Sequence, residues 1–473
     1  LLKLGCLRVT PEGGLQEEAG LCQTLDLPSG RIRITALTAD GGPFEAVLWF
    51  AAATLVLEAA CGRPLEVCFA TWRDRDRKQL HLEVPVDVCD RTHDVGKDHV
   101  QPTTDALLWW HDNREYPSEW DEDLSLQTWA RGHVHNPAER LVFGGALVSA
   151  HSLVPIRDEA VHWQNWAGRA WRFQAAAAET HLFAVALRAQ KDGDPQNWSA
   201  EAGALLDPGT LAAAAQDEQA RWDEFWSRSH IVVNPQADAT DPGWQVGRNY
   251  QLFRYMLACN RGGPLPLLFN GGIFTTDSVP GRITGNNGEI ALEPAGPSTP
   301  DFRRWMFCAF MAQNQRWLGW PMLASGDHDL VGPLITFYRD RAGTAAARAR
   351  VWGAAGVAFP EPQKLWGLSW NAGPDGKCRA AHLTENFNMG LEFAWMALCA
   401  RSVLGTDVAA DVDWIVGTVR FYDSYYRGLK NQRTGSELSG DGKLVIYPST
   451  SVELAVGATN PIGVIAGLRR VTD

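Results

Sequence analysis

Residues 207–229 read DPGTLAAAAQDEQARWDEFWSRS, and this stretch separates two parts of the chain that differ in residue pattern. Phe225 and Trp226 follow Trp222 by three and four positions, so the three rings share one face of a helix. An alanine-rich run leads into them. We therefore predict that residues 207–240 contain a helix that links two domains.

Residues 1–206, before this helix, are predicted to form an antiparallel β-sandwich. Short runs rich in β-forming residues, such as Arg31–Ala36 and His181–Leu187, alternate with Gly, Pro and Asp. Such spacing is typical of sandwiches. Asp40–Gly42 is a candidate hairpin turn.

Residues 241–473, after the helix, are predicted to be helical. The candidate helices are 245–259, part of 303–324, 329–342, 385–404, 409–427 and 454–468. The connections 260–302 and 359–384 are long. Long structured connections between helices tend to carry function.

Composition excludes several classes of partner. The net charge is -12, which argues against nucleic acid and anionic membranes, since both require a basic face. No apolar run approaches the roughly 20 residues of a membrane span. The nine cysteines lack metal-binding spacing and are expected to be mostly buried free thiols. No G-x-S-x-G or HExxH motif is present, so we expect neither a serine nucleophile nor a metal or other cofactor.

The stretch 303–320 combines aromatic rings with amides. Trp305, Trp317 and Trp320 surround the polar run Gln313–Arg316, and the whole chain has 21 Trp but only 8 Tyr. Buried polar groups need partners. Indole faces beside planar donors and acceptors suit a sugar, whose C–H face stacks while its hydroxyls form hydrogen bonds.

The conformation of this stretch decides which of its groups can act together. In a helix, Asn314 and Trp317 share a face while Arg316 points elsewhere. Pro321 is expected to end or kink such a helix near Trp320. Asn314 and Arg316 would therefore face one site only if the segment were irregular; a core helix with one exposed Arg is the alternative.

Three other loops place polar groups beside aromatic residues. Asn270 lies in a glycine-containing loop, which permits close approach to a ligand but equally suits a plain turn. Glu361 lies between two prolines, where the stiff backbone can position a carboxylate, although a solvated Glu is equally compatible. Glu453 precedes the predicted helix 454–468, with Ser451 as its candidate N-cap. The helix dipole there would favour the ionised form, whereas a general acid needs burial to raise its pKa.

These segments, in this order, resemble the six-hairpin glycoside hydrolases of family 95, the inverting α-L-fucosidase and α-L-galactosidase group. They are more similar still to an uncharacterised bacterial branch of that group. Asn314–Pro321 resembles the family segment N-x-Q-x-N-Y-W-P. Residues 359–367 correspond to its H-x-x-T-D-x-W-G loop, and 448–453 to its P-S-x-S-P-E loop. The similarity covers roughly 220–470.

The resemblance implies an N-terminal β-sandwich followed by an (α/α)6 barrel, and an exo-acting, inverting glycosidase that acts on an oligosaccharide or polysaccharide. Glu453 would then be the general acid, and Asn314 would help to hold the attacking water. The expected substrate-binding residues are Asn270, Trp305, Arg316, Trp320, Glu361 and Trp366.

Several residues depart from the family pattern, and these departures limit which properties of the family are expected here. Ala312 replaces the second water-binding Asn, and Pro360 and Glu361 stand at the His positions of the second loop. Lys364 stands at the Asp position of that loop, and Val452 replaces the Pro before the acid. Fucose specificity is therefore not expected, and a sugar that is anionic or differently hydroxylated fits Arg316 and Glu361.

The number of helices is the largest departure. About six helices follow the linker, whereas a full barrel has twelve, so we expect either an incomplete barrel or one completed by another chain. The catalytic base would then lie outside this sequence. A glycoside phosphorylase and a carbohydrate-binding protein on a degenerate scaffold remain alternatives. Oligomeric state and compartment stay open, a periplasmic or secreted location being one option.

Overall fold

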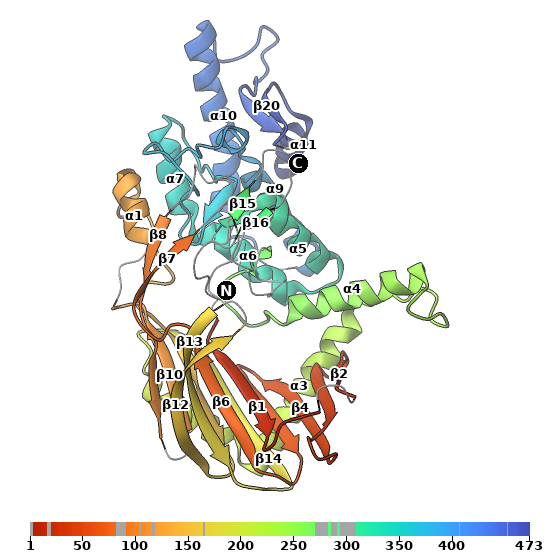
Figure 1. Cartoon of the computed structure of the whole chain (residues 1–473). Coiled ribbons are helices and arrows are strands. Elements are labelled where there is room, and N and C mark those ends of the chain that lie inside the picture. The colour runs from red at the N-terminus through yellow and green to blue at the C-terminus, as the bar shows by residue number, and fades with distance from the viewer. Residues whose placement is uncertain are drawn as a thin grey trace.

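The chain has a β-rich part and a helical part, which occupy its first and second halves (Figure 1). The computed structural model describes residues 3–16, 20–81, 91–103, 106–115, 119–163, 166–269, 282–284, 291–293, 309–405, 407–451 and 453–473. Within these residues, no helix combines the length and the hydrophobicity that a bilayer span requires.

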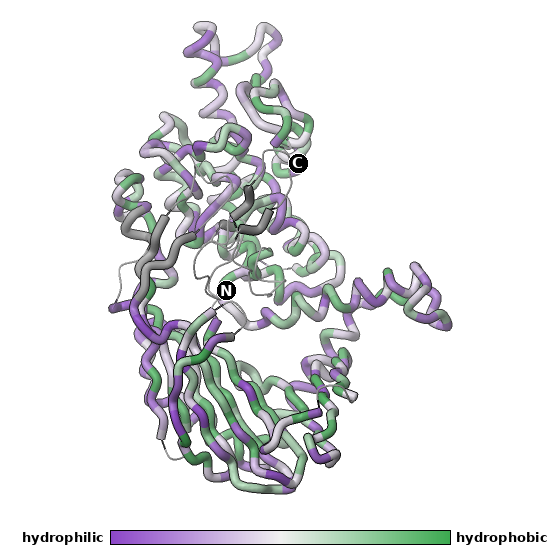
Figure 2. The backbone as a smooth tube through the Cα atoms, in the orientation of Figure 1, coloured by the Kyte–Doolittle hydropathy of each residue, from purple (hydrophilic) through white to green (hydrophobic). Residues whose placement is uncertain are grey.

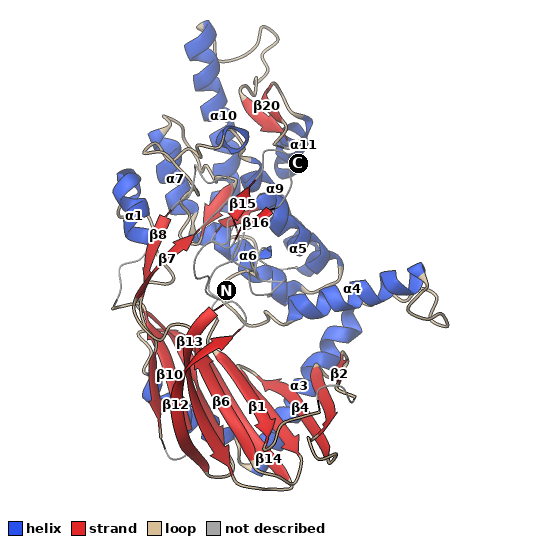
Figure 3. Cartoon of the chain, in the orientation of Figure 1, coloured by secondary structure: helices blue, strands red, loops and turns tan. Residues whose placement is uncertain are grey.

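Two antiparallel sheets form the β-rich part (Figure 3). The larger has the order β2 (Cys22–Asp26), β3 (Arg31–Leu37), β4 (Pro43–Ala51), β5 (Thr54–Ala60), β14 (Thr180–Lys191), β11 (Leu141–Ser149), β10 (Ala106–Asp112) and β9 (His99–Pro102). The smaller has the order β1 (Cys6–Pro11), β6 (Leu65–Thr71), β13 (Trp166–Ala175) and β12 (Leu153–Trp163). The predicted turn joins β3 to β4, where Thr38 N donates to Gly42 O at 2.8 Å.

Alternate side chains along the strands point inward and form the core between the two sheets. Leu107 and Trp109, two positions apart on β10, are both buried, and the ring of Trp109 lies 4.4 Å from that of Phe69 on β6. Figure 2 shows hydrophobic segments in the sandwich strands and around α5, α6 and α9, and more hydrophilic ones at the projecting end of α10. Trp72 and Trp198 are also fully buried, so much of the tryptophan content serves packing.

The predicted linker helix is α3 (Pro208–Arg228), which Asp207 caps by accepting a hydrogen bond from Thr210 N. Its ring face packs on the larger sheet, where Trp226 Nε1 donates to Leu27 O at 2.7 Å. The residues between α3 and α4 (Pro242–Ala258) form a loop. The domain boundaries at 206 and 240 stay predictions.

The helical part contains α4 and the helices that follow it. After α4 come α5 (Ala312–Ala324), α6 (His328–Asp340), α7 (Ala342–Val351), α8 (Ala381–Thr384), α9 (Asn388–Leu404), α10 (Val412–Thr434) and α11 (Ile462–Thr472). Two-stranded pairs accompany them: β15 (Arg282–Thr284) with β16 (Ala291–Glu293), β17 (Ala309–Met311) with β18 (Pro362–Lys364), and β19 (Ser449–Ser451) with β20 (Ala455–Ala458).

The structure differs from the predicted helices in two places. No helix begins at residue 454, because β20 occupies that region and α11 starts only at Ile462. α7 was not predicted as a separate helix. Pro321 lies inside α5, so the helix does not end there, and the kink expected as the other possibility stays a prediction. Because Pro321 has no N–H, α5 lacks one hydrogen bond, to the carbonyl of Trp317.

An insertion from the sandwich contacts the helical part. The connection from β10 to β11 contains α1 (Glu119–Leu126) and the 3₁₀ turn η1 (Thr128–Ala130), and α1 lies beside α7 in Figure 1. Thr344 Oγ1 on α7 donates to His133 O at 2.8 Å. The strands β7 (Arg77–His81) and β8 (Arg91–Val95) extend from the sandwich in the same direction. α2 (Trp198–Leu205) and the 3₁₀ turn η2 (Pro195–Asn197) precede α3.

The prediction of an antiparallel β part followed by a helical part is confirmed. Closure of the helices into an (α/α)6 barrel stays a prediction. The described cysteines are free thiols, but only Cys68 and Cys378 are buried while Cys22 and Cys259 are exposed, so the expectation of mostly buried thiols is wrong.

Candidate active site

Gln313 joins two carboxyl groups that are far apart in sequence. Its backbone N–H donates to Glu361 Oε1 at 3.2 Å, and its side-chain Nε2 donates to Glu453 Oε1. Because one residue contacts both carboxyl groups, Glu361 and Glu453 lie close together. We call Gln313, Glu361 and Glu453 the carboxyl cluster.

Strand pairing places Glu361 at the start of α5. In the β17–β18 ladder, Met311 pairs with Pro362, so the antiparallel register brings Glu361 next to Ala312, the first residue of α5. The first N–H groups of a helix have no partner within the helix. Glu361 accepts from one of them and so acts as a cap that comes from 48 residues further along the chain.

Burial is what sets the ionisation of Glu361. Its side chain is almost wholly enclosed, with 2% exposure, and burial raises the pKa of Glu361 to about 7. The nearby carboxylates of Glu453 and Glu392 also raise this pKa, while the bond from Gln313 N and the charge of Arg316 lower it. Glu361 therefore exchanges a proton near neutral pH.

Glu453 follows β19 and adopts a left-handed backbone with φ of 60°. This conformation costs a non-glycine residue roughly 1–2 kcal/mol. Such strain tends to occur at functional sites. Because no helix begins here, the predicted N-cap role of Ser451 is wrong, and Ser451 instead ends β19.

Two buried amide side chains of α5, Gln315 and Asn314, differ in their hydrogen bonding. Gln315 is buried and ties the helix to the preceding segment, since its Oε1 accepts from Phe269 N and its Nε2 donates to Leu267 O, both at 2.9 Å. Asn314 is also buried, and its Oδ1 has no hydrogen-bond partner among the described residues. A buried amide oxygen needs a partner, and bound water or a ligand can supply one.

Arg316 and Trp320 meet a third carboxylate. Trp320 Nε1 donates to Glu392 Oε1 at 2.5 Å, and Arg316 lies 3.9 Å from Glu392 Oε2. Because α5 is helical here, Arg316 points away from Asn314, as the sequence argument required. Arg316 remains partly exposed, so it can reach a ligand at the rim of the site.

Trp366 is held by a residue that the sequence did not single out. Asp123, on α1, accepts from Trp366 Nε1 at 2.9 Å and from Lys364 Nζ at 3.1 Å. All three side chains are buried. Asp123 lies 241 residues before Lys364, and no local motif marks it. The platform role predicted for Trp366 stays a prediction.

Gln363 is a second residue that the sequence did not single out. It lies in β18 and follows Glu361 by two positions. Its exposure is 0%, and neither its Oε1 nor its Nε2 has a hydrogen-bond partner among the described residues. The hydroxyl of the fully buried Tyr338 is likewise unpaired. Two further predicted site residues, Asn270 and Trp305, lie outside the described residues.

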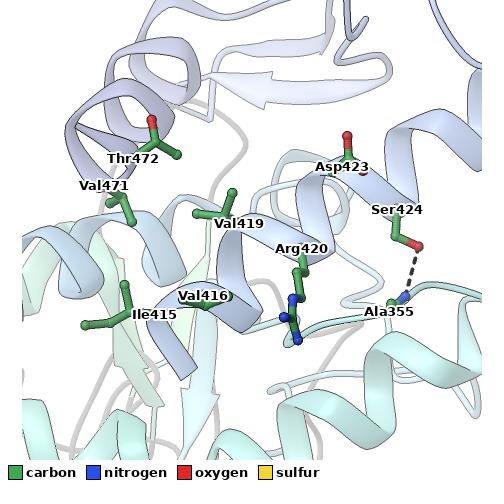
Figure 4. Close-up of a pocket in the computed structure, with 9 residues that line it drawn as sticks. All are labelled: Ala355, Ile415, Val416, Val419, Arg420, Asp423, Ser424, Val471 and Thr472. Atoms are coloured by element: carbon green, nitrogen blue, oxygen red, sulfur yellow. Dashed lines mark hydrogen bonds between the residues drawn. The ribbon is translucent and has the colours of Figure 1, made fainter. Parts of the chain in front are cut away.

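A groove of about 470 Å³ lies elsewhere, between α10 and α11 (Figure 4). Ile415, Val416, Val419 and Val471 form much of its wall. Its polar contact is internal, because Ala355 N donates to Ser424 Oγ at 3.0 Å. Its charged lining residues are Arg420 and Asp423, and Asp423 already pairs with Arg427, so the carboxyl cluster, where two carboxyl groups meet, is the better candidate for catalysis.

Comparisons with known proteins give a fold and leave the activity open. Residues 1–231 match the N-terminal family model of a domain of unknown function (DUF5703). No curated protein matches the sequence significantly. The chain has the fold of a solved protein from the human microbiome that is described as a kojibiose phosphorylase, with a TM-score of 0.57 and 11% identity.

That alignment covers 98% of this chain and 54% of the solved protein, so the present chain spans about half its length. A bacterial glucoamylase bound to acarbose (TM-score 0.40, 8% identity, 89% and 50% coverage) is less similar. A family 92 α-mannosidase from Bacteroides thetaiotaomicron is also less similar, with a TM-score of 0.38 and 10% identity. That alignment covers 95% of this chain and 58% of the mannosidase. The comparison with TM-score 0.57 thus supports the expected fold, and membership of family 95 stays a prediction.

Proposed function

We propose that the protein cleaves a terminal glycosidic bond in an oligosaccharide or polysaccharide. The observation that carries this proposal is the contact between Gln313 and Glu453, which brings the amides of α5 to a loop carboxylate 140 residues away. Glu453 would give its proton to the leaving oxygen, and Asn314, whose Oδ1 has no hydrogen-bond partner in the described part of the chain, would hold the water that attacks the anomeric carbon.

Other residues near Glu453 and Asn314 would contact the sugar. Trp320, on the same helix as Asn314, would stack against the ring, with its Nε1 fixed by Glu392. Arg316 would bind a hydroxyl or a carboxylate of the sugar from the rim. Trp366, Asn270 and Trp305 remain candidate contacts from the neighbouring segments.

The test replaces the proposed acid in the full chain. We expect Glu453→Gln to lower kcat by about 10²–10⁴-fold, which is the usual contribution of general acid catalysis. Binding should be retained, because the amide has the same shape. Release of reducing sugar from a panel of oligosaccharides measures the rate, and calorimetry with the same sugars measures affinity.

Glu437→Gln is the matched control, since Glu437 is an exposed glutamate outside the cluster. It should behave as the wild type. Sugar binding by the wild type without any turnover would contradict the proposal and would favour a carbohydrate-binding protein. Full activity in Glu453→Gln would remove Glu453 from the role of acid.

A glycoside phosphorylase is the second candidate, and the shared fold with the protein described as a kojibiose phosphorylase favours it. In that reaction phosphate replaces water as the attacking group. Turnover that depends on added inorganic phosphate and yields a glycosyl phosphate would establish this alternative. Turnover in phosphate-free buffer that yields a free sugar would exclude it.

A further inference from the structure

We propose that Glu361 is the catalytic base of this site, so that this chain carries both carboxyl groups of the reaction. The inference rests on the proposed glycosidase function. It differs from the expectation that the base lies outside the chain. Three features of the structure support it: the position of Glu361, the groups around it and the rigidity of its loop.

Position is the first feature. Glu361 and Glu453 both bind Gln313, through its backbone and its side chain respectively. Asn314, the proposed water-holding residue, follows Gln313 directly. The base and the residue that holds its water are therefore positioned by the same first turn of α5.

The surrounding groups are the second feature. Gln363 follows Glu361 by two positions, and among the described residues neither its amide atoms nor Asn314 Oδ1 has a hydrogen-bond partner. Buried polar atoms need partners. A water molecule and sugar hydroxyls would supply these partners beside the carboxylate. This arrangement suits a base that takes a proton from bound water.

Rigidity is the third feature. Buried arginines hold the loop around Glu361 by its carbonyl groups: Arg348 donates to Ala358 O at 2.7 Å and to Gly367 O at 2.6 Å. Arg341 Nε donates to Leu365 O at 2.8 Å. A base on a fixed backbone keeps its oxygen in line with the water through the reaction.

The proposed step balances in a single displacement. Glu361 takes a proton from water as the water oxygen bonds to the anomeric carbon. The bond from that carbon to the leaving oxygen breaks, and Glu453 gives its proton to the leaving oxygen. The anomeric configuration is inverted, as expected when the two carboxyl groups act on opposite sides of the sugar.

The pH dependence follows from the groups that face Glu361. These are Glu453 after β19, Arg316 on α5, Glu392 on α9, Tyr338 on α6 and Tyr422 on α10. Burial, joined by the two other carboxylates, raises the pKa of Glu361 to about 7. The step needs Glu361 ionised and Glu453 protonated, so the pair must hold one proton, and kcat/KM should follow a bell-shaped pH profile with one limb near pH 7.

The experiment uses the full chain and Glu361→Gln. Because the amide oxygen can still accept from Gln313 N, the variant should keep the capped helix while losing the base. We expect kcat/KM at its optimum pH to fall by about 10²–10⁴-fold, and the pH profile to lose its limb near pH 7. Glu437→Gln should keep both the rate and the pH profile. Circular dichroism should show an unchanged fold.

Two other readouts separate this inference from the proposed function. In a ¹³C-glutamate-labelled protein, a carboxyl that titrates near pH 7 should be present in the wild type and absent in Glu361→Gln. Product analysis by NMR should show inversion. If the wild type turns over glycosides while Glu361→Gln keeps the normal rate and pH profile, the inference is overturned and the proposed function stands. If the wild type cleaves no glycoside, both fail.

Discussion

At the scale of single residues, Glu361 shows how strongly burial controls chemistry. Sequence placed it between two prolines, where a solvated carboxylate was an equal possibility. In the structure it is enclosed beside two other glutamates and caps α5. Removing a carboxylate from water favours its protonated form, and neighbouring negative charges add to that effect.

This environment predicts how stability depends on pH. A raised pKa means that the folded state binds more protons than the unfolded state between about pH 4.5 and pH 7. Stability should therefore fall as pH rises through this window. Glu361→Gln removes the titration, so its stability relative to the wild type should increase by up to roughly 3 kcal/mol between pH 4.5 and pH 8.

Urea denaturation of both proteins at several pH values measures this difference. Acid denaturation caused by the other carboxyl groups is the same in both proteins and should cancel in the comparison. A stability difference that is constant from pH 4.5 to pH 8 would contradict the assigned pKa of Glu361.

At the scale of elements, the strand β18 is held from two sides. On one side it pairs with β17, which leads into α5. On the other, Lys364 and Trp366 bind Asp123 of α1, an element inserted from the sandwich. Buried ion pairs contribute little compared with apolar contacts, but loss of one partner leaves the other charge poorly compensated in a medium of low polarity.

We therefore expect Asp123→Asn to destabilise the protein by about 3–5 kcal/mol. Adding Lys364→Met, which removes the second charge at similar volume, should restore most of that loss. A double-mutant cycle from urea denaturation gives the coupling between the two residues.

The control for this cycle is Asp423→Asn on α10. It breaks an exposed ion pair with Arg427, whose atoms lie 2.7 Å apart, and should change stability by no more than about 0.5 kcal/mol. Additive effects of Asp123→Asn and Lys364→Met would show that the two side chains do not act as a pair.

At the scale of the whole molecule, α3 joins the sandwich to the helices. Trp222 stacks on Tyr255 of α4 with ring centroids 5.3 Å apart, and its other contacts include Gly30 at the turn between β2 and β3. A Cβ on Gly30 would lie only 2.4 Å from the Trp222 ring. The absence of a side chain at residue 30 thus permits the two halves to dock.

Gly30→Ala should separate this contact from backbone effects. Both Gly30 (φ 65°) and Gly62 (φ 63°) are left-handed, but a Cβ on Gly62 meets nothing within 4 Å. Gly62→Ala should therefore show only the conformational cost, about 1 kcal/mol. Gly30→Ala should add about 1–3 kcal/mol of overpacking. Equal melting temperatures for the two variants would argue against close docking of α3.

Local patterns accounted for much of the fold. The three rings of α3 and the glycine turn at 40–42 were predictable because each depends on residues a few positions apart. The count of tryptophans was a weaker guide. Trp72, Trp198 and Trp414 are fully buried in cores, so indoles that pack the interior cannot be distinguished from those that bind sugar by counting them.

The sequence by itself indicated that a β-rich part precedes a helical part, and it selected Asn314, Glu361 and Glu453 as candidate site residues. Only the tertiary structure decided that Gln313 joins Glu361 to Glu453, and that Asp123 binds Lys364. The physical reason is range. Periodicity and turn chemistry act between neighbouring residues, whereas the charged and hydrogen-bonding groups that shift the pKa of Glu361 lie from 31 (Glu392) to 92 (Glu453) positions away.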